Sequence, residues 1–464
     1  MSAKFESKSI TRRRALQAGL AGAAGVWLAN RVGWTAEDAA PADKTAAPDG
    51  AAATEEKKAA PPEKAKAVIQ IWMWGGPPHL DTFDPKPDSG NDYAGPLDRP
   101  IETNVSGIRI GQLLPVLAKQ ADKFSIIRSA THGNNGHETA AYMVQTGREP
   151  GGRTVYPSVG AVVSLFKGYD GGYDGLIPPY VVLTQPQGRF SEAGFLGAKY
   201  KPFATGGDPN AARFVVEGVV APGISDKRQQ DRRALLGNLN ALARAMQGDP
   251  RLNDLQKAEE AAYDLILGDA GKVFDLSTEK QELRQEYGLS TFGQSCLMAR
   301  RLVEKGVRYI TINCDGWDTH KAHFAAMRRK LPELDKGMGT LIRDLADHGL
   351  LETTIVWCTG EFGRTPKVDW QPPWDGGRHH HGACFSMLVA GGGFRGGQVV
   401  GESDALGEQV KDRPVYPWDL MGTMYELLGI DPETTVRHPQ GTLVRITPNA
   451  DDGVKLGGRL KELT

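Results

Sequence analysis

The sequence predicts an α/β fold in which a doubly wound, mostly parallel sheet is sandwiched by helices. Two observations carry this prediction. Short apolar runs recur from residue 67 onward, and near-continuous apolar runs are typical of buried parallel strands. Segments with helical periodicity separate these runs, and strands that alternate with helices fold into layered α/β domains.

The individual elements follow from the same patterns. Apolar runs predict strands at residues 67–74, 124–128, 180–184, 307–313, 354–359 and 383–390. Helical periodicity predicts helices at residues 113–121, 137–146, 158–166, 232–247, 254–267, 292–304, 320–348 and 418–428. Residues 185–290 hold few strong strands and two long helices, which favours an inserted cap within a single domain at 67–464.

The first 35 residues are predicted to be an export signal. Arg12, Arg13 and Arg14 precede an uncharged run at residues 18–30 that is rich in Ala and Gly, and this pattern resembles a twin-arginine leader. The run is shorter than the ~20 apolar residues of a transmembrane helix, so we expect no stable transmembrane span. The prediction is a periplasmic or otherwise exported protein whose partner during export is the twin-arginine translocase.

Residues 36–66 are predicted to be a disordered linker. They consist mainly of Ala, Pro, Lys, Glu and Asp, and such a segment cannot bury enough apolar surface to offset its ordering entropy. The formal net charge of the whole chain is −1. This value argues against a nucleic-acid partner, because domains that bind nucleic acid usually present a basic face.

A stretch rich in metal-binding residue types follows the strand predicted at 307–313. Asp318 and His320 are two residues apart and point the same way if the chain is extended, whereas His320 and His323 share a face once a helix begins. Ligands bind outside the carboxyl ends of strands in α/β folds. We favour a metal site over the alternative, which is a helix cap at Asp318 and Thr319 with surface histidines.

Polar side chains also follow the first two predicted strands. Asp81 comes after the first strand and is either a metal ligand or a turn cap. His132 and Asn134 lie in the loop before the next predicted helix, which His137 opens. The free N–H groups and the dipole at a helix N-terminus favour an anion and a neutral imidazole. His137 is therefore a candidate ligand or nucleophile, with a capping or packing role as the alternative.

Two more polar stretches lie further along the chain. Glu361 and Arg364 follow the strand predicted at 354–359. Arg364 is expected either to hold a phosphate or sulfate oxygen through paired hydrogen bonds or to pair structurally with a carboxylate. A run of three histidines, His379 to His381, precedes the last predicted strand. Successive side chains cannot all face one point, so one or two of them at most are ligands.

The segment that His137 opens resembles sulfatases and nucleotide phosphodiesterases of the alkaline-phosphatase superfamily. In those proteins a nucleophile opens a helix and Thr-Gly-Arg-x-Pro follows, as it does at residues 146–150 here. Their Cys, Ser or Thr nucleophile falls on His137, which implies a His nucleophile, a reassigned ligand or no covalent step, with Thr139 as a weaker substitute. Their Asp-His-Gly metal-binding turn falls on Glu361 and Phe362, which leaves His380 to supply the imidazole.

A wider set of motifs resembles the family catalogued as domain of unknown function 1501, which carries similar export leaders and is grouped with alkaline-phosphatase-like folds. The motifs are Gly-Gly-Pro-x-His-Leu-Asp-Thr-Phe-Asp-Pro-Lys, Gly-Trp-Asp-Thr-His, Gly-Glu-Phe-Gly-Arg-Thr-Pro, Gly-Arg-x-His and Ala-Gly-Gly-Gly. The resemblance spans nearly all of residues 67–447 and implies an alkaline-phosphatase-like fold. One departure is His379, where the family pattern usually has Asp.

The resemblance implies an exported, metal-dependent hydrolase of a phosphate or sulfate ester. The expected metal ligands are Asp318, His320, Glu361, His380 and Asp81. The expected catalytic residues are His137 and Arg364, and the residues expected to contact a small-molecule or glycan ester substrate are Asn134, Arg148 and His132.

The expected cofactor is a divalent metal. Oxygen and imidazole ligands together suit Zn²⁺, Mn²⁺ or Fe better than Ca²⁺, although Ca²⁺ stays an alternative beside Zn²⁺ and Mn²⁺. The rival function is a non-catalytic, alkaline-phosphatase-like scaffold that binds a polysaccharide or an envelope partner. The missing hydroxyl nucleophile and Phe362 favour this rival.

Overall fold

The structure is a computed structural model that describes residues 60–151, 154–185, 192–212, 214–216 and 270–464. The predicted leader (1–35), most of the predicted linker (36–66) and the helices predicted at 232–247 and 254–267 lie outside these residues. The end of the linker lies inside them. There the N–H groups of Lys64 and Ala65 both donate to the carbonyl oxygen of Leu427, at 2.8 Å.

An eight-stranded sheet forms the centre of the fold, in the order β12-β4-β11-β8-β1-β7-β5-β6. The strands are β1 (Ala67–Met73), β4 (Phe124–Ala130), β5 (Tyr180–Leu183), β6 (Phe203–Ala204), β7 (Tyr309–Cys314), β8 (Thr354–Thr359), β11 (Phe385–Ala390) and β12 (Gln398–Val400). Only β11 runs antiparallel to its neighbours. The predicted mostly parallel sheet is therefore confirmed, and β6 adds part of the predicted cap to it.

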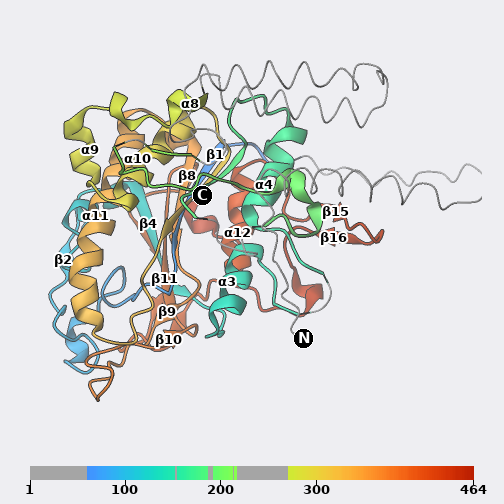
Figure 1. The fold of residues 1–464 in the computed structure, drawn as a ribbon. Helices are drawn as coiled ribbons and strands as arrows, with labels where there is room; N and C mark the ends of the chain where they lie inside the picture. Colours follow the sequence, from blue (N-terminus) through green and yellow to red (C-terminus); the bar gives the residue numbers. More distant parts are fainter. Residues whose placement is uncertain (1–59, 152–153, 186–191, 213, 217–269) are drawn as a thin grey trace, which may run out of the picture. The chain divides into compact units, whose positions relative to one another are not determined.

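Helices cover both faces of this sheet (Figure 1). One layer contains α9 (Gln281–Tyr287), α10 (Thr291–Glu304) and α11 (His323–Asp347), and the other contains α3 (His137–Thr146), α4 (Val159–Lys167) and α12 (Pro417–Leu427). The short helix α2 (Pro115–Ala118) packs against α11. Side chains of β1 alternate between the two cores. Ile69 and Ile71 pack into the first core, and Val68 and Trp72 into the second. This alternation explains why a buried strand is apolar at nearly every position.

The shorter elements lie outside the central sheet. They are α8 (Ala270–Val273) and the two-stranded pairs β2 (Ile101–Glu102) with β3 (Arg109–Ile110), β9 (Gly363–Arg364) with β10 (His380–His381), β13 (Glu402–Ser403) with β14 (Val410–Asp412), and β15 (Thr435–Arg437) with β16 (Leu443–Arg445). Within the described residues, no helix is both long enough and apolar enough to cross a membrane.

The start of α11 differs from its prediction in a way that matters for the site. A helix from residue 320 would place His320 and His323 on one face, but α11 begins at His323. Ala322 lies in the left-handed region with φ 48°, which separates the helix from the preceding loop. His320 therefore stays in the loop with Asp318, and the prediction of a shared helical face is wrong.

Strand direction decides which loops meet. The segments after β1, β4, β7 and β8 leave the carboxyl ends of parallel strands, so they emerge at one edge of the sheet. Because β11 runs the other way, the segment before it, which contains β10, reaches that same edge. Five segments far apart in sequence are thus brought together.

Candidate metal centre

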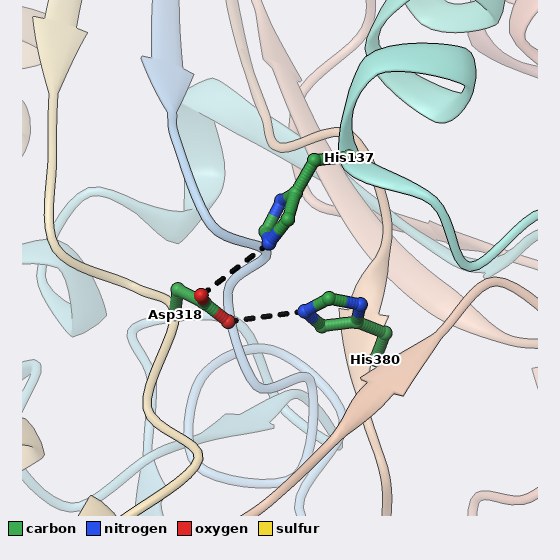
Figure 2. Close-up of side chains that lie close together, drawn as sticks. All are labelled: His137, Asp318 and His380. Atoms are coloured by element: carbon green, nitrogen blue, oxygen red, sulfur yellow. Dashed lines mark hydrogen bonds and ion pairs between the residues drawn. The ribbon is translucent and has the colours of Figure 1, made fainter.

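Asp318 lies at the centre of a cluster of histidines at this edge of the sheet. Figure 2 shows Asp318 in the loop after β7, His137 at the start of α3 and His380 on β10, with both imidazoles directed at the carboxylate. Asp318 Oδ2 lies 3.3 Å from His137 Nε2, and Oδ1 lies 3.1 Å from His380 Nε2. His320 Nε2 lies 3.0 Å from the same Oδ1 and 2.9 Å from His380 Nε2.

The other nitrogen of each imidazole faces an acceptor. His137 Nδ1 lies 2.8 Å from the Glu361 carboxylate, and His380 Nδ1 lies 2.8 Å from the carbonyl oxygen of Asn135. Since these oxygens can only accept, both Nδ1 atoms carry the proton. A ring that holds its proton on Nδ1 can present an Nε2 lone pair to a metal ion beside Asp318, which is how a metal-binding histidine is arranged.

This donor set fits a divalent transition metal. Tetrahedral Zn²⁺ with bonds of about 2.0–2.1 Å has ligand atoms about 3.3 Å apart, and the gaps between donor atoms here are 2.9–3.3 Å. Within the described residues, His137, Asp318 and His380 form the group of ligand atoms close enough to share an ion. Imidazole with carboxylate suits Zn²⁺ or Mn²⁺ better than Ca²⁺. His320 is not in that group, although its Nε2 lies 3.0 Å from Asp318 and 2.9 Å from His380. The predicted Asp318, His320 and His380 thus lie together, and His137 joins Asp318 and His380.

The electrostatics of His137 differ from the sequence prediction. A helix N-terminus alone favours the neutral ring, but the hydrogen bond to Glu361 is the largest influence, and it raises the pKa of His137. The nearby Asp318 adds to this effect, so the predicted neutral preference is wrong for the metal-free chain. For His320, burial and the nearby Arg364 guanidinium lower the pKa.

The guanidinium of Arg364 forms its hydrogen bonds within the protein. Its guanidinium is buried and donates to Asp318 Oδ1 at 2.8 Å, to the carbonyl oxygen of Gly75 at 3.1 Å and to the carbonyl oxygen of Arg378. Burial alone would raise the pKa of Asp318, but this guanidinium lowers it overall. Of the two predicted roles for Arg364, the structure contains the pairing with a carboxylate.

Glu361 lies behind His137. It is fully buried, and its Oε1 accepts from the N–H of Gly75 at 2.8 Å as well as facing His137 Nδ1. Its Oε2 has no hydrogen-bond partner among the described residues. Phe362 is stacked on His380, with ring centroids 4.5 Å apart. Glu361 therefore contacts the His137 imidazole through Oε1, and its role as a metal ligand stays a prediction.

Asp81 lies in a separate buried network. Its Oδ2 pairs with His323 Nε2 at 2.8 Å and with Arg378 Nε at 3.3 Å. His323 Nδ1 in turn lies 2.6 Å from the Thr319 hydroxyl. Both partners of Asp81 are buried, so the carboxylate neutralises Arg378 instead of joining the cluster around Asp318.

The three residues predicted to contact substrate are divided between two cavities. His132 and Asn134 line a cavity of about 490 Å³ beside the N-terminal end of α3. Burial lowers the pKa of His132 to about 4, and its Nε2 lies 2.6 Å from the carbonyl oxygen of Glu361. Arg148 lines another cavity of about 400 Å³ near β16 and pairs with Asp452 at 3.4 Å.

Sequence reasoning missed one partner of the cluster, Asn135, and gave His379 no role of its own within the run of three histidines. Asn135 acts through its backbone carbonyl, which leaves no signal in the sequence. His379 contacts His320, with the two Nδ1 atoms 2.8 Å apart. His380 faces Asp318, and His381 Nε2 instead lies 2.8 Å from the carbonyl oxygen of Glu408. Alternation along an extended strand would have separated His380 from its two neighbours.

Comparisons with solved structures give distant similarities. The chain is 10% identical to the lipoteichoic acid synthase LtaP from Listeria monocytogenes, covering 83% of this chain and 74% of that one, with a TM-score of 0.37. It is 15% identical to the PsFucS1 sulfatase from Pseudoalteromonas sp., covering 79% and 68%, with a TM-score of 0.33. It is 12% identical to the phosphonate monoester hydrolase SpPMH from Silicibacter pomeroyi, covering 78% and 73%, with a TM-score of 0.33.

Comparisons of sequence are more decisive. A search of curated proteins finds no match. The family model described as "Protein of unknown function (DUF1501)" matches residues 65–455, which include every residue of the cluster.

Proposed function

The chain belongs to the DUF1501 family of proteins of unknown function, and from this premise we propose that it is an exported, metal-dependent hydrolase of a phosphate or sulfate ester. One observation carries the proposal. The Nε2 atoms of His137, His320 and His380 surround the Asp318 carboxylate at 3.0–3.3 Å. Two of the Nδ1 atoms are held by oxygen acceptors.

The residues of the chain have separate tasks in this proposal. Asp318 and the three imidazoles hold a divalent ion, and Arg364 keeps the Asp318 carboxylate ionised and in place. Glu361 fixes the ring of His137. When bound, such an ion polarises an ester and lowers the pKa of water. The fit to an imidazole and carboxylate donor set favours Zn²⁺ or Mn²⁺.

The same geometry argues against a covalent step at His137. Its Nδ1 is directed at Glu361 and its Nε2 at Asp318, so neither nitrogen is free to attack a substrate. We therefore assign His137 to metal binding. Water is then the nucleophile, and hydrolysis proceeds without a phosphorylated or sulfated enzyme.

The test combines metal analysis with a panel of esters. Protein purified from its native host is expected to contain about one divalent transition-metal ion per chain and to hydrolyse an aryl phosphate, an aryl sulfate or an aryl phosphodiester. His320→Ala is expected to lose both properties. His348→Ala, at the exposed end of α11, is the matched control and should keep both. Metal-free protein with ester hydrolysis unchanged by His320→Ala would contradict the proposal.

A second candidate is the non-catalytic scaffold that binds a polysaccharide or an envelope partner. One observation favours it: Arg364, the candidate anion clamp, already donates to Asp318 and to two backbone carbonyls. Trp370, which is 39% exposed and stacked on Phe324 with a centroid distance of 5.7 Å, offers an aromatic surface near the loop of β10. Tight glycan binding by the metal-loaded chain, with no turnover of any ester, would favour this candidate.

Export is part of the main proposal. It rests on the arginines at 12–14 and the uncharged run at 18–30, which lie outside the described residues. Fractionation of the native host is expected to place the protein outside the cytoplasm. Replacement of Arg12 and Arg13 by Lys should retain it inside. Equal export of both forms would contradict the twin-arginine route.

A further inference from the structure

The cavity of about 490 Å³ beside the N-terminal end of α3 adjoins the cluster around Asp318. His132, which lines it, has its Nε2 2.6 Å from the carbonyl oxygen of Glu361. Asn135, which also lines it, has its carbonyl oxygen 2.8 Å from His380 Nδ1. Asp318 faces the other nitrogen of the His380 ring, so an ester held at Asp318 would have its alcohol part beside this cavity. The volume is within the range of about 300–1,000 Å³ that is typical of ligand pockets.

Two side-chain amides in the cavity wall have their NH₂ groups free. Asn134 Oδ1 accepts from the N–H of Gly136 at 2.9 Å and from the Thr139 hydroxyl at 2.7 Å. Asn135 Oδ1 accepts from the N–H of Gly382 at 2.6 Å. A backbone N–H can only donate, so these contacts establish which atom of each amide is the oxygen. Within the part of the chain that the structure describes, neither Nδ2 has an acceptor.

The loop that carries these amides is held in place by the segment between β10 and β11. The N–H groups of His132 and Gly133 both donate to the carbonyl oxygen of Gly382, at 3.1 and 2.9 Å. A Cβ atom added to Gly382 would lie 2.3 Å from the carbonyl oxygen of Asn134, so the two segments touch and only glycine fits. Because the loop is already fixed, the two NH₂ groups can bind a ligand with little further loss of entropy.

The rest of the lining indicates which ligand fits. Glu149 is exposed, and its carboxylate has no ion pair or hydrogen bond among the described residues. Met143 and Pro150 add apolar surface. A hydroxyl group both donates and accepts, so two amide donors and one carboxylate acceptor match a set of neighbouring hydroxyls. The same carboxylate repels an anion. The lining therefore suits a neutral, polyhydroxylated ring with an apolar face of C–H groups, which is a sugar.

We propose that this cavity binds a neutral sugar ring, with Asn134 and Asn135 donating to its hydroxyls and Glu149 accepting from one of them. The inference deepens the proposed function and rests on it in one respect: the sugar is the alcohol part of the ester that is hydrolysed at Asp318. The substrate class is then a phosphate or sulfate ester of a saccharide. Binding of the sugar itself needs no metal, so it can be measured separately.

The first experiment measures sugar binding to the full chain without metal. Saturation-transfer difference NMR is recorded with the methyl glycosides of glucose, galactose, mannose and N-acetylglucosamine, and at least one is expected to bind. Asn135→Asp keeps the oxygen that accepts from Gly382 but replaces the NH₂ donor with an anionic oxygen, so affinity should fall about tenfold or more.

Asn449→Asp is the matched control. Its Oδ1 also accepts from a backbone N–H, and it does not line the cavity, so it should bind the glycoside as the wild type does. Urea unfolding of each variant checks that the fold is intact. A wild type that binds none of these glycosides, or an Asn135→Asp variant that binds as tightly as the wild type, would overturn the proposal.

Inorganic phosphate tests the alternative that the cavity holds an anion. If Glu149→Gln strengthens phosphate binding, Asn135→Asp abolishes it and no glycoside binds, the amides serve an anion and the sugar proposal is wrong. The expected result is the reverse: glycoside binding that phosphate does not displace.

The second experiment tests the link to hydrolysis. With metal-loaded protein, the ratio of kcat/KM for hexose 6-phosphates and 6-sulfates to kcat/KM for the aryl esters should fall about tenfold in Asn135→Asp. An unchanged ratio would mean that the sugar is not the alcohol part of the substrate. A chain that binds glycosides but hydrolyses no ester would contradict the proposed function alone. A chain that hydrolyses aryl esters but binds no glycoside would contradict this inference alone.

Discussion

Two aspartates at the same edge of the sheet have partners of the same chemical types but opposite environments. In the closed network, Asp81 pairs with His323 and Arg378, and all three side chains are at most 1% exposed. In the open cluster, Asp318 faces His137, His320, His380 and Arg364, and its side chain is 43% exposed. The closed network has one imidazole for its carboxylate, and the open cluster has three.

The difference in burial indicates that the closed network stabilises the fold, whereas the open cluster is suited to bind a ligand. In the closed network Arg378 neutralises Asp81, so burial dominates and lowers the pKa of His323 to about 4. In the open cluster His137 is only partly buried and lies between two carboxylates, which raise its pKa. A buried, matched set of charges holds loops together. Surplus imidazole nitrogens around an exposed carboxylate are instead available to a ligand.

The largest expected difference between the two aspartates is in the free energy of unfolding, and replacing Asp81 should lower it most. Asp81→Asn leaves Arg378 buried without a counter-charge, and loss of one partner of a buried pair typically costs about 3–5 kcal/mol of unfolding free energy. Asp318→Asn also deprives a buried guanidinium, that of Arg364, of its carboxylate, but the Asp318 side chain is 43% exposed to water, so the loss should be smaller, about 1–2 kcal/mol. Urea denaturation at pH 7 measures both. Equal losses in the two variants would mean that the open cluster is structural too.

Acid should weaken the closed network through His323. The unfolded imidazole takes up a proton near pH 6.5, but the folded one does so only near pH 4. Its contribution to stability is therefore complete above pH 6.5 and is lost as the pH falls toward 4, by about 3 kcal/mol in all. Unfolding free energies measured across this range should fall less steeply for His323→Gln. If the unfolding free energy of His323→Gln falls with pH as steeply as that of the wild type, His323 does not contribute to the loss of stability in acid.

The open cluster is tested by metal affinity. His380→Ala removes a proposed ligand, and Zn²⁺ affinity should fall by more than about 100-fold, beyond the range that outer partners give. His381→Ala is the matched control because its ring faces the carbonyl oxygen of Glu408. Titration calorimetry measures both. If the two variants bind Zn²⁺ equally, His380 is not a ligand.

The smallest expected effect distinguishes the two roles of Arg364. Arg364→Lys cannot reproduce the set of hydrogen bonds to Asp318 and the backbone, and metal affinity should fall by up to about tenfold. The KM for an ester substrate should stay unchanged at saturating metal. A large rise in KM with unaltered metal affinity would instead support the substrate-anion role that the sequence suggested.

Much of the fold could be predicted from the sequence. All six predicted strands are present with ends within two residues of the prediction, because buried parallel strands leave long apolar runs that little else produces. β6 and β12 were missed because each is short and lies at an edge of the sheet, where burial leaves a weaker pattern.

The candidate site was only partly predictable, for physical reasons. Asp318, His320 and His380 were named because a strand end and residue type sufficed to find them. Asp81 has the same residue type at a comparable strand end, but its role depends on Arg378, which lies about 300 residues away in the chain and whose burial the sequence does not reveal. The tautomers that distinguish a ligand from a packing histidine depend on partners such as the Asn135 carbonyl.

The most direct test of the central claim is anomalous scattering from crystals of protein exported by its native host. We predict a transition-metal peak bounded by Asp318 and the Nε2 atoms of His137, His320 and His380, with no peak at Asp81. A chain without a peak at the open cluster, or with its metal bound elsewhere, would contradict the account.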